Sequence, residues 1–169
     1  LSSPILRPLD TASGGGPNGF MRLAVVREIA PTLGGCELTF LPRTAIDIEK
    51  ARAQHDGYVA LLRRLGCRII SLPADPALPD SVFVEDVAVV LPELAVITRP
   101  GAPSRRPETA AVAAALAPYR RLAALHPPGT LDGGDVLRSE RAIFAGMSGR
   151  SNADGIAQLR ALAGASGFE

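Results

Sequence analysis

Two adjacent acidic residues, Glu85 and Asp86, lie in the middle of the largely apolar stretch LPDSVFVEDVAVV, positions 78–90. The β-branched residues around them predict a strand over residues 82–91. Because successive side chains of a strand point to opposite faces, a carboxylate here would lie close to a hydrophobic core. An unpaired buried charge costs on the order of several kcal/mol, so we expect a positively charged partner, either a side chain or a ligand. The alternative is that both acids are solvated charges on an edge strand.

Three further acidic residues, Asp80, Asp132 and Asp135, occupy comparable places in the sequence. Asp80 precedes the first pair, and the other two belong to the segment TLDGGDVLR at 130–138. Each group lies at or near the first strand of a predicted repeat, so packing of the repeats around an axis would gather the acids. The glycines of DGGD fit a turn, and they also fit a bulge that another backbone or a ligand approaches closely.

Two arginines, Arg99 and Arg150, follow strands at the same position of successive repeats. An arginine fork binds a carboxylate in bidentate fashion. The plainer interpretation of either arginine alone is a surface residue. Taken together, acids for a cation and arginines for a carboxylate predict a site for a zwitterion such as arginine.

The elements that would position these residues form an α/β pattern. A strand over 21–29 leads into a long loop typical of a lid, then into a helix between Thr44 and Gly66, with Thr44 and Asp47 spaced as a capping box. Two strand–strand–helix–strand repeats follow the strand at 67–75. The first comprises strands at 82–91, 94–99 and 121–125 with a helix at 104–117, and the second comprises strands at 130–138 and 142–148 with a helix at 152–163.

The second repeat reaches Glu169 before its closing strand. A repeat length in the mid-forties is in the range of stacked repeats. A repeat array that stops within a unit leaves an open sheet edge, so we expect the polypeptide to continue, or a second chain to pair with this edge as a homo-oligomer.

Composition limits the classes of function. The 169 residues are 47% hydrophobic, which suits one globular domain over residues 21–169, and the Ser-, Pro- and Gly-rich residues 1–20 predict a flexible tail or a cloning remnant. A net charge of +1 offers no field to attract nucleic acid or a membrane surface. Cys36, Cys67, His55 and His126 show no metal-ligand spacing, and so few cysteines suit the reducing cytoplasm.

Three motifs carry a resemblance to a known family. The segments LPDSVFVEDVAVV, ITRPGAPSRR and TLDGGDVL, in this order and spacing, resemble the dimethylarginine dimethylaminohydrolases of the pentein superfamily. The resemblance extends from about Arg22 to about Leu162. It implies part of a pentein-type α/β propeller, incomplete at the C-terminus, and hydrolysis of methylated arginine to citrulline and a methylamine without a cofactor.

The resemblance also implies roles for the acidic residues. Asp80 and Asp86 would hold the substrate guanidinium, with Glu85 in the same binding stretch. Asp132 would orient a catalytic histidine, which in the family donates a proton to the leaving amine while a cysteine attacks the guanidinium carbon.

For the rest of the substrate, the family pattern implies that Arg99 and Arg150 hold the α-carboxylate and that the loop at Leu33–Gly35 is a lid. The family's histidine and nucleophilic cysteine lie C-terminal to this stretch, and no residue of the chain matches either. Cys67 is predicted to be a buried thiol of the core, whereas Cys36 lies in the predicted lid loop, where its thiol could be exposed.

Two alternatives stay open at this point. One keeps the enzyme class but changes the substrate to arginine or agmatine, because the superfamily includes deiminases. The other is a catalytically incomplete binding or assembly module of pentein fold.

Overall fold

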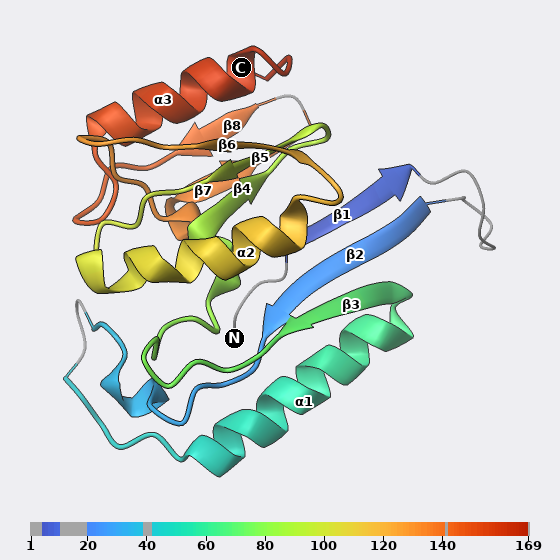
Figure 1. Ribbon diagram of the computed structural model, residues 1–169, viewed down its shortest axis with the longest axis vertical. Helices are drawn as coiled ribbons and strands as arrows, with labels where there is room; N and C mark the ends of the chain where they lie inside the picture. The colour runs from blue at the N-terminus through green and yellow to red at the C-terminus, as the bar shows by residue number, and fades with distance from the viewer. Residues whose placement is uncertain (1–4, 11–19, 39–41, 141, 169) are drawn as a thin grey trace. The chain divides into compact units, whose positions relative to one another are not determined.

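The computed structural model describes residues 5–10, 20–38, 42–140 and 142–168 of the chain. The chain divides into two compact units, Leu1–Val84 and Glu85–Glu169, and each unit is mixed α/β (Figure 1). Within the described ranges, no helix has the length and apolar character required to cross a bilayer.

The first unit contains a three-stranded sheet. β1 (Ile5–Asp10) pairs antiparallel with β2 (Phe20–Arg27), and β3 (Cys67–Leu72) pairs parallel with β2 on the other side. Parallel strands need a crossover connection, and helix α1 (Ile48–Arg64) provides it. The strand β1 lies within residues 1–20, for which the sequence predicted a flexible tail. A strand forms there because the backbone of Ile5–Asp10 pairs with β2 along its full length.

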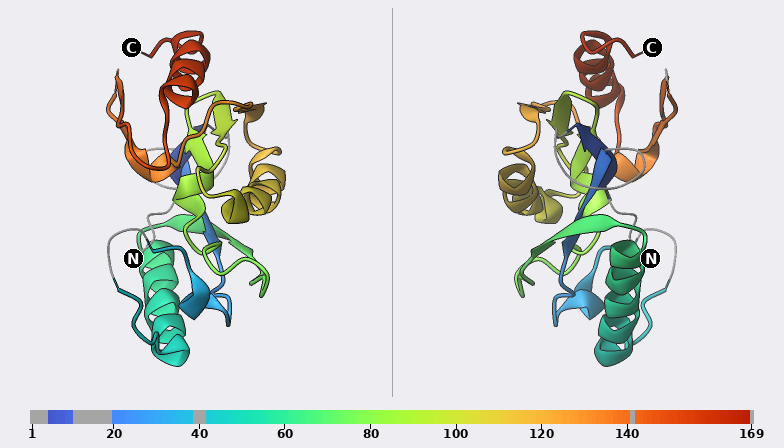
Figure 2. Two further views of the ribbon diagram at one scale, coloured as in Figure 1. Left: turned by 90° about the vertical axis from the view of Figure 1, so that its left-hand side faces the viewer. Right: turned by 90° about the vertical axis from the view of Figure 1, so that its right-hand side faces the viewer.

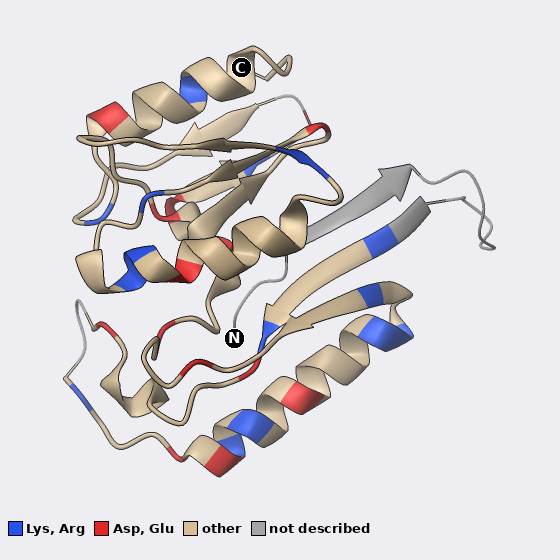
Figure 3. Cartoon of the chain, viewed as in Figure 1, with Lys and Arg blue, Asp and Glu red and all other residues tan. Residues whose placement is uncertain are grey.

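Helix α1 covers this sheet with one apolar face. Val59 and Leu62 pack with Ala24, Val26 and Cys67 in a buried cluster, and Figure 2 shows α1 alongside β3. Basic and acidic residues are interspersed along the helix (Figure 3). This arrangement is that of an amphipathic helix with a solvated outer face.

The ends of α1 follow local signals. Asp47 is the N-cap, and its carboxylate accepts a hydrogen bond from the backbone N–H of Lys50 at 3.0 Å. The predicted capping box of Thr44 and Asp47 is therefore wrong, because Asp47 is itself the N-cap. Gly66, with φ of 82°, follows the helix in the left-handed conformation that terminates helices, as predicted.

The second unit repeats one succession of elements. β4 (Ala88–Val90), β5 (Leu94–Ile97) and β6 (Arg121–Ala124) form a sheet in that order, β4 antiparallel and β6 parallel to β5. The 3-10 helix η3 (Pro103–Glu108) and α2 (Thr109–Leu116) connect β5 to β6. β7 (Val136–Arg138) and β8 (Ile143–Ala145) then form an antiparallel pair, and α3 (Ala153–Gly164) follows.

The core of the second unit surrounds β5. All four residues of this strand are buried, because α2 contacts β4 and β5 while α3 packs on the same sheet through Leu159 and Ala163 (Figure 1). The buried cluster comprises Val89, Leu91, Leu94, Val96, Leu125, Leu131, Leu159 and Ala163.

Two predicted strands are wrong at their acidic ends. Residues 84–87 form the 3-10 helix η2 (Val84–Val87) before the short strand β4, and Gly133–Asp135 forms the 3-10 helix η4 before β7. The β-branched residues of the first segment favour a strand, but tertiary contacts outweigh that propensity. Both acidic segments are therefore turns that lead into strands.

Candidate functional site

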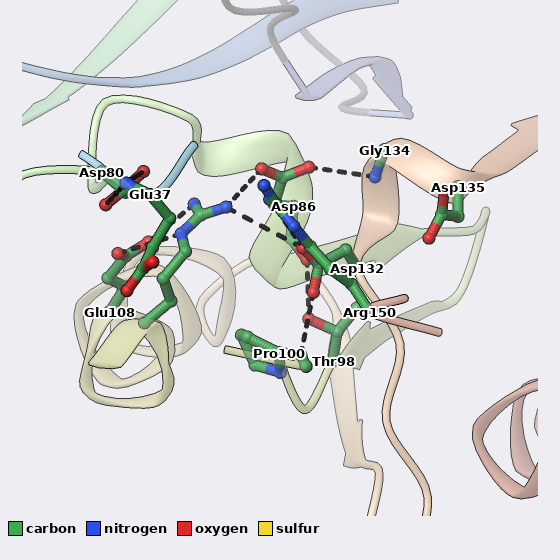
Figure 4. Close-up of polar contacts among 12 residues, drawn as sticks. Glu37, Asp80, Asp86, Thr98, Pro100, Glu108, Asp132, Gly134, Asp135 and Arg150 are labelled. Atoms are coloured by element: carbon green, nitrogen blue, oxygen red, sulfur yellow. Dashed lines mark hydrogen bonds and ion pairs between the residues drawn. The ribbon is translucent and has the colours of Figure 1, made fainter. Parts of the chain in front are cut away.

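Asp86 is held by contacts to both of its carboxylate oxygens. Oδ2 accepts a hydrogen bond from Nη1 of Arg105 at 2.6 Å, and Oδ1 accepts one from the backbone N–H of Gly134 at 3.1 Å (Figure 4). The backbone carbonyl of Asp86 accepts from the hydroxyl of Thr98 at 2.8 Å. The positively charged partner that the sequence required is thus a side chain, that of Arg105.

Arg105 is buried among carboxylates. Its side chain is 1% exposed, and its Nε and Nη2 donate to the two carboxylate oxygens of Glu108 at 3.2 and 2.9 Å. Nη1, which contacts Asp86, also lies 4.0 Å from Oδ2 of Asp132. Burial acts to lower the pKa of Arg105, but the hydrogen bonds and charges of Glu108 and Asp86 outweigh it and raise that pKa above its ordinary value. Arg105 therefore remains a cation that three carboxylates share.

Asp132 is the third carboxylate of this cluster. Its Oδ1 accepts from the backbone N–H of Gly101 at 3.0 Å, and its Oδ2 accepts from Nη1 of Arg150 at 3.2 Å (Figure 4). The Asp132 side chain is 4% exposed, whereas that of Arg150 is 31% exposed. Two guanidinium groups, one buried and one partly exposed, thus converge on the same carboxylate oxygen.

The glycines of DGGD allow the acidic segments to approach each other. A Cβ on Gly133 would overlap the carbonyl oxygen of Glu85, and a Cβ on Gly134 would lie 2.7 Å from Oδ1 of Asp86. Real Cβ atoms essentially never approach so closely, so any larger residue would push η2 and η4 apart. DGGD is thus a turn, as the first interpretation had it, and its glycines also lie where another backbone approaches closely, as the second had it.

Comparison with known proteins identifies the family. The family model described as "N,N dimethylarginine dimethylhydrolase, eukaryotic" matches residues 42–168. The chain belongs to the dimethylarginine dimethylaminohydrolase family. It is 47% identical over 143 residues to N(G),N(G)-dimethylarginine dimethylaminohydrolase of Streptomyces coelicolor, covering 82% of this chain and 54% of the relative. The corresponding protein of Pseudomonas aeruginosa is 37% identical over 118 residues, covering 69% of this chain and 46% of that protein.

Solved structures of the dimethylarginine dimethylaminohydrolase family agree with this fold. A cysteine-to-serine mutant of the Pseudomonas aeruginosa enzyme complexed with citrulline superposes with a TM-score of 0.83 at 34% identity, covering 87% of this chain and 58% of that one. An adduct of dimethylarginine dimethylaminohydrolase with S-methyl-L-thiocitrulline superposes with a TM-score of 0.81 at 33% identity, covering 87% of this chain and 58% of that one. The chain has the pentein fold and spans about half the length of the curated relatives that it matches.

Among the predicted dimethylarginine dimethylaminohydrolase residues, Arg99 contacts the backbone of the second repeat. Its Nη1 donates to the carbonyl of Gly129 at 3.2 Å, and within the described ranges it forms no ion pair. The predicted contact of Arg99 with the substrate α-carboxylate stays a prediction, and the arginine that contacts Asp86 is Arg105. Glu85, half-buried in η2, has its backbone against Gly133, and its contact with substrate stays a prediction.

Asp80 and Leu33 belong to the first unit. Both carboxylate oxygens of Asp80 accept from the backbone N–H of Glu37, at 3.0 and 3.1 Å, just beyond the 3-10 helix η1 (Leu33–Gly35). Leu33 and Cys36 are buried in a cluster with Val82, so the thiol of Cys36 is not exposed. The predicted roles of Asp80 in substrate binding and of Leu33 in a lid stay predictions.

A pocket of about 150 Å³ adjoins this cluster in the first unit. It is lined by Ile29, Leu33, Ala51, Gln54, His55, Tyr58, Val82 and Phe83. Burial lowers the pKa of His55 below its ordinary value, against the opposing charges of Asp56 and Glu28. The imidazole is therefore held neutral beside an apolar pocket. Within the described residues, no group of three or more His, Cys, Asp or Glu side chains is arranged to hold a metal ion.

Sequence reasoning missed Arg105 and Glu108. A signal was available, because SRRPE places an arginine three residues before a glutamate, the spacing of a helical ion pair. The same spacing also describes the solvated pair of Glu49 and Arg52 in α1. Spacing alone could not show which of the two pairs is buried.

Proposed function

We propose that the complete protein hydrolyses Nω-methylated arginine, such as asymmetric dimethylarginine or monomethylarginine, to citrulline and methylamines. Membership of the dimethylarginine dimethylaminohydrolase family supports this reaction. The observation that carries the proposal for this chain is the cluster of Asp86, Asp132 and Arg150, which pairs acceptors for a cation with a donor for a carboxylate. This chain would then supply substrate-binding residues.

The charge of the cluster favours a cationic group. Three carboxylates, Asp86, Glu108 and Asp132, face two guanidinium groups, Arg105 and Arg150, and leave one negative charge in excess. A carboxylate can accept about four hydrogen bonds, and the side chain of Asp86 receives two, from Arg105 and Gly134. Its side chain is also 17% exposed. Asp86 is therefore suited to accept hydrogen bonds from a substrate guanidinium.

Arg150 is suited to the other end of the substrate. It is far more exposed than Arg105, 31% against 1%, and a guanidinium binds a carboxylate in a fork geometry. We assign the substrate α-carboxylate to Arg150, with Arg105 as the buried charge behind the site. The predicted role of Arg99 at the same carboxylate belongs to this proposal as a prediction. Orientation of a catalytic histidine by Asp132 belongs to this proposal as a prediction.

The proposal extends to the architecture of the complete protein. The two successive strand–strand–helix arrangements of the second unit suit an α/β propeller in which further units follow. A cytoplasmic location and a homo-oligomer that pairs through the open sheet edge stay predictions from the sequence.

Citrulline release from asymmetric dimethylarginine by the complete protein tests the function. We expect Asp86→Asn to lower kcat/KM by about 10- to 150-fold, since a hydrogen bond to a charged group contributes about 1.5–3 kcal/mol and about 1.4 kcal/mol corresponds to a factor of ten. The exposed turn residue Glu140 offers a matched control, and Glu140→Gln should leave the rate unchanged.

Competition with arginine and agmatine decides among the alternatives. Preference for either of these over methylated arginine would replace the proposed reaction with that of a deiminase. If none of these guanidines is hydrolysed, to citrulline or, from agmatine, to N-carbamoylputrescine, the hydrolase proposal fails and the binding-module alternative takes its place.

A further inference from the structure

A carboxylate outside the cluster binds two serine hydroxyls on either side of Arg150. Oδ2 of Asp135 accepts hydrogen bonds from the hydroxyls of Ser148 and Ser151, each at 2.6 Å. Asp135 closes the DGGD motif, and Figure 4 shows it apart from the contacts between Asp86 and the buried guanidinium. The proposed reaction assigns this carboxylate no role.

The two serine hydroxyls also accept hydrogen bonds from backbone N–H groups of the site. The hydroxyl oxygen of Ser148 accepts from the backbone N–H groups of Arg150 and Ser151 at 3.0 and 3.1 Å. The hydroxyl oxygen of Ser151, which is buried, accepts from the backbone N–H of Asp132 at 3.0 Å. One carboxylate thus reaches the backbone of both members of the Arg150–Asp132 pair through two hydroxyls.

The direction of these hydrogen bonds is determined by Asp135. An ionised carboxylate only accepts, and a hydroxyl has a single proton to donate. Once each serine proton points to Asp135, the hydroxyl oxygens present their lone pairs to the backbone N–H groups. Removal of the Asp135 acceptor would free both hydroxyls to rotate, and the backbone donors would lose oriented partners.

We propose that Asp135 is a positioning residue that acts through Ser148 and Ser151 to hold Arg150 against Asp132. The inference rests on the proposed function, in which Arg150 binds the substrate α-carboxylate. Asp135 thereby favours substrates that carry an α-carboxylate, without touching them. The matching contacts on both sides of Arg150 explain why the loop between β8 and α3 contains a serine at each of these two positions.

Two substrates that differ only in the carboxylate test this inference. In the complete protein, Ser148→Ala should raise KM for asymmetric dimethylarginine by about tenfold, the effect of losing one hydrogen bond to a charged group, and Asp135→Ala, which loses both such bonds, should raise it at least as much. The lost hydroxyl of Ser148→Ala contacts the backbone of Arg150 and not that of Asp132, so for the decarboxylated analogue Nω,Nω-dimethylagmatine its kcat/KM should change by less than about twofold, a difference too small to reflect a lost hydrogen bond. A role in folding alone would lower the rates for both substrates equally, and that result would overturn the inference.

Matched variants separate the network from a general effect of serine loss. Ser139 also makes a turn contact, since its hydroxyl donates to the carbonyl of Ala142 at 3.1 Å, but among the residues that the structure describes no hydrogen bond joins it to Arg150. Ser139→Ala should leave both substrates unaffected. Asp135→Asn should recover part of the loss of Asp135→Ala, because an amide oxygen accepts both hydroxyl protons without the charge.

Amide hydrogen exchange keeps this inference separable from the proposed reaction. The backbone amides of Arg150 and Ser151 should exchange faster in Asp135→Ala than in Ser139→Ala. Unchanged exchange would refute the positioning role, whether or not the protein is active. Wild-type protein that releases dimethylamine from neither substrate would refute the reaction, while faster exchange at these amides would still support the positioning of Arg150 by Asp135.

Discussion

Replacement of Arg105 by methionine tests whether buried ion pairs organise the acidic cluster. Methionine retains an unbranched side chain but donates no hydrogen bond. Arg105→Met removes the two contacts to Glu108, at 3.2 and 2.9 Å, and the contact to Asp86 at 2.6 Å. The side chains of Glu108 and Asp86, 3% and 17% exposed, then lose their cation. Both charges would lose this guanidinium without gaining full hydration.

The expected loss follows from this burial. Removal of one partner of a buried ion pair costs about 3–5 kcal/mol because an uncompensated charge remains. Three lost contacts place Arg105→Met at the upper end of that range. The pair of Arg52 and Glu49 has the same sequence spacing and a 2.8 Å contact, but its side chains are 44% and 83% exposed. Arg52→Met should therefore cost less than about 1 kcal/mol.

Urea denaturation of the complete protein measures both variants, and a double variant identifies the cause. If the uncompensated charge of Glu108 is responsible, Arg105→Met combined with Glu108→Leu should recover at least half of the loss, because an apolar pair replaces a buried ion pair at little cost. Equal losses for Arg105→Met and Arg52→Met would refute the organising role of the buried pair. A double variant no more stable than Arg105→Met would show that lost packing, not charge, is responsible.

Two further predictions concern close packing and pH. Gly133→Ala should reduce the free energy of unfolding by more than about 2 kcal/mol and lower citrulline release, because its Cβ would overlap the Glu85 carbonyl oxygen. Gly57 lies in open space within α1, so Gly57→Ala should instead raise the free energy of unfolding by about 0.5–1 kcal/mol in the same denaturation assay. Because burial lowers the pKa of His55 in the folded protein, its contribution to stability is complete above the ordinary pKa of 6.5 and is lost as pH falls below that value towards the folded pKa. Urea midpoints at pH 7.5 and 5.5 should therefore differ less in His55→Gln than in the wild type. His126→Gln, at an exposed position, is the control and should show the wild-type difference. The same difference in all three proteins would contradict the lowered pKa of His55.

Local signals were sufficient for several helices and strands. Asn152 caps α3 by accepting from the backbone N–H of Gly155 at 2.9 Å, and the helix begins where the sequence placed it. The strand predicted near 121–125 is β6 (Arg121–Ala124). Such ends are predictable because capping and turn residues act on backbone groups within a few positions.

The segments around the site were less predictable because distant contacts shape them. The strand predicted over 82–91 gave way to η2 at Val84–Val87, where Gly134, 48 residues from Asp86, donates to the Asp86 carboxylate. The pattern of hydrophobic residues indicates how buried a segment is on average. It does not indicate that another backbone lies against one particular carbonyl group.

The sequence by itself determined that an acidic pair within an apolar stretch requires a cation, and that aspartates and arginines recur in a pattern suited to a zwitterion. Only the tertiary structure decided which cation it is. Arg105 and Arg52 have the same three-residue spacing to a glutamate, yet the side chains of one pair are 1% and 3% exposed and those of the other 44% and 83% exposed. Burial arises from the packing of elements distant in sequence, and burial decides whether an ion pair is a solvated surface contact or the centre of a site.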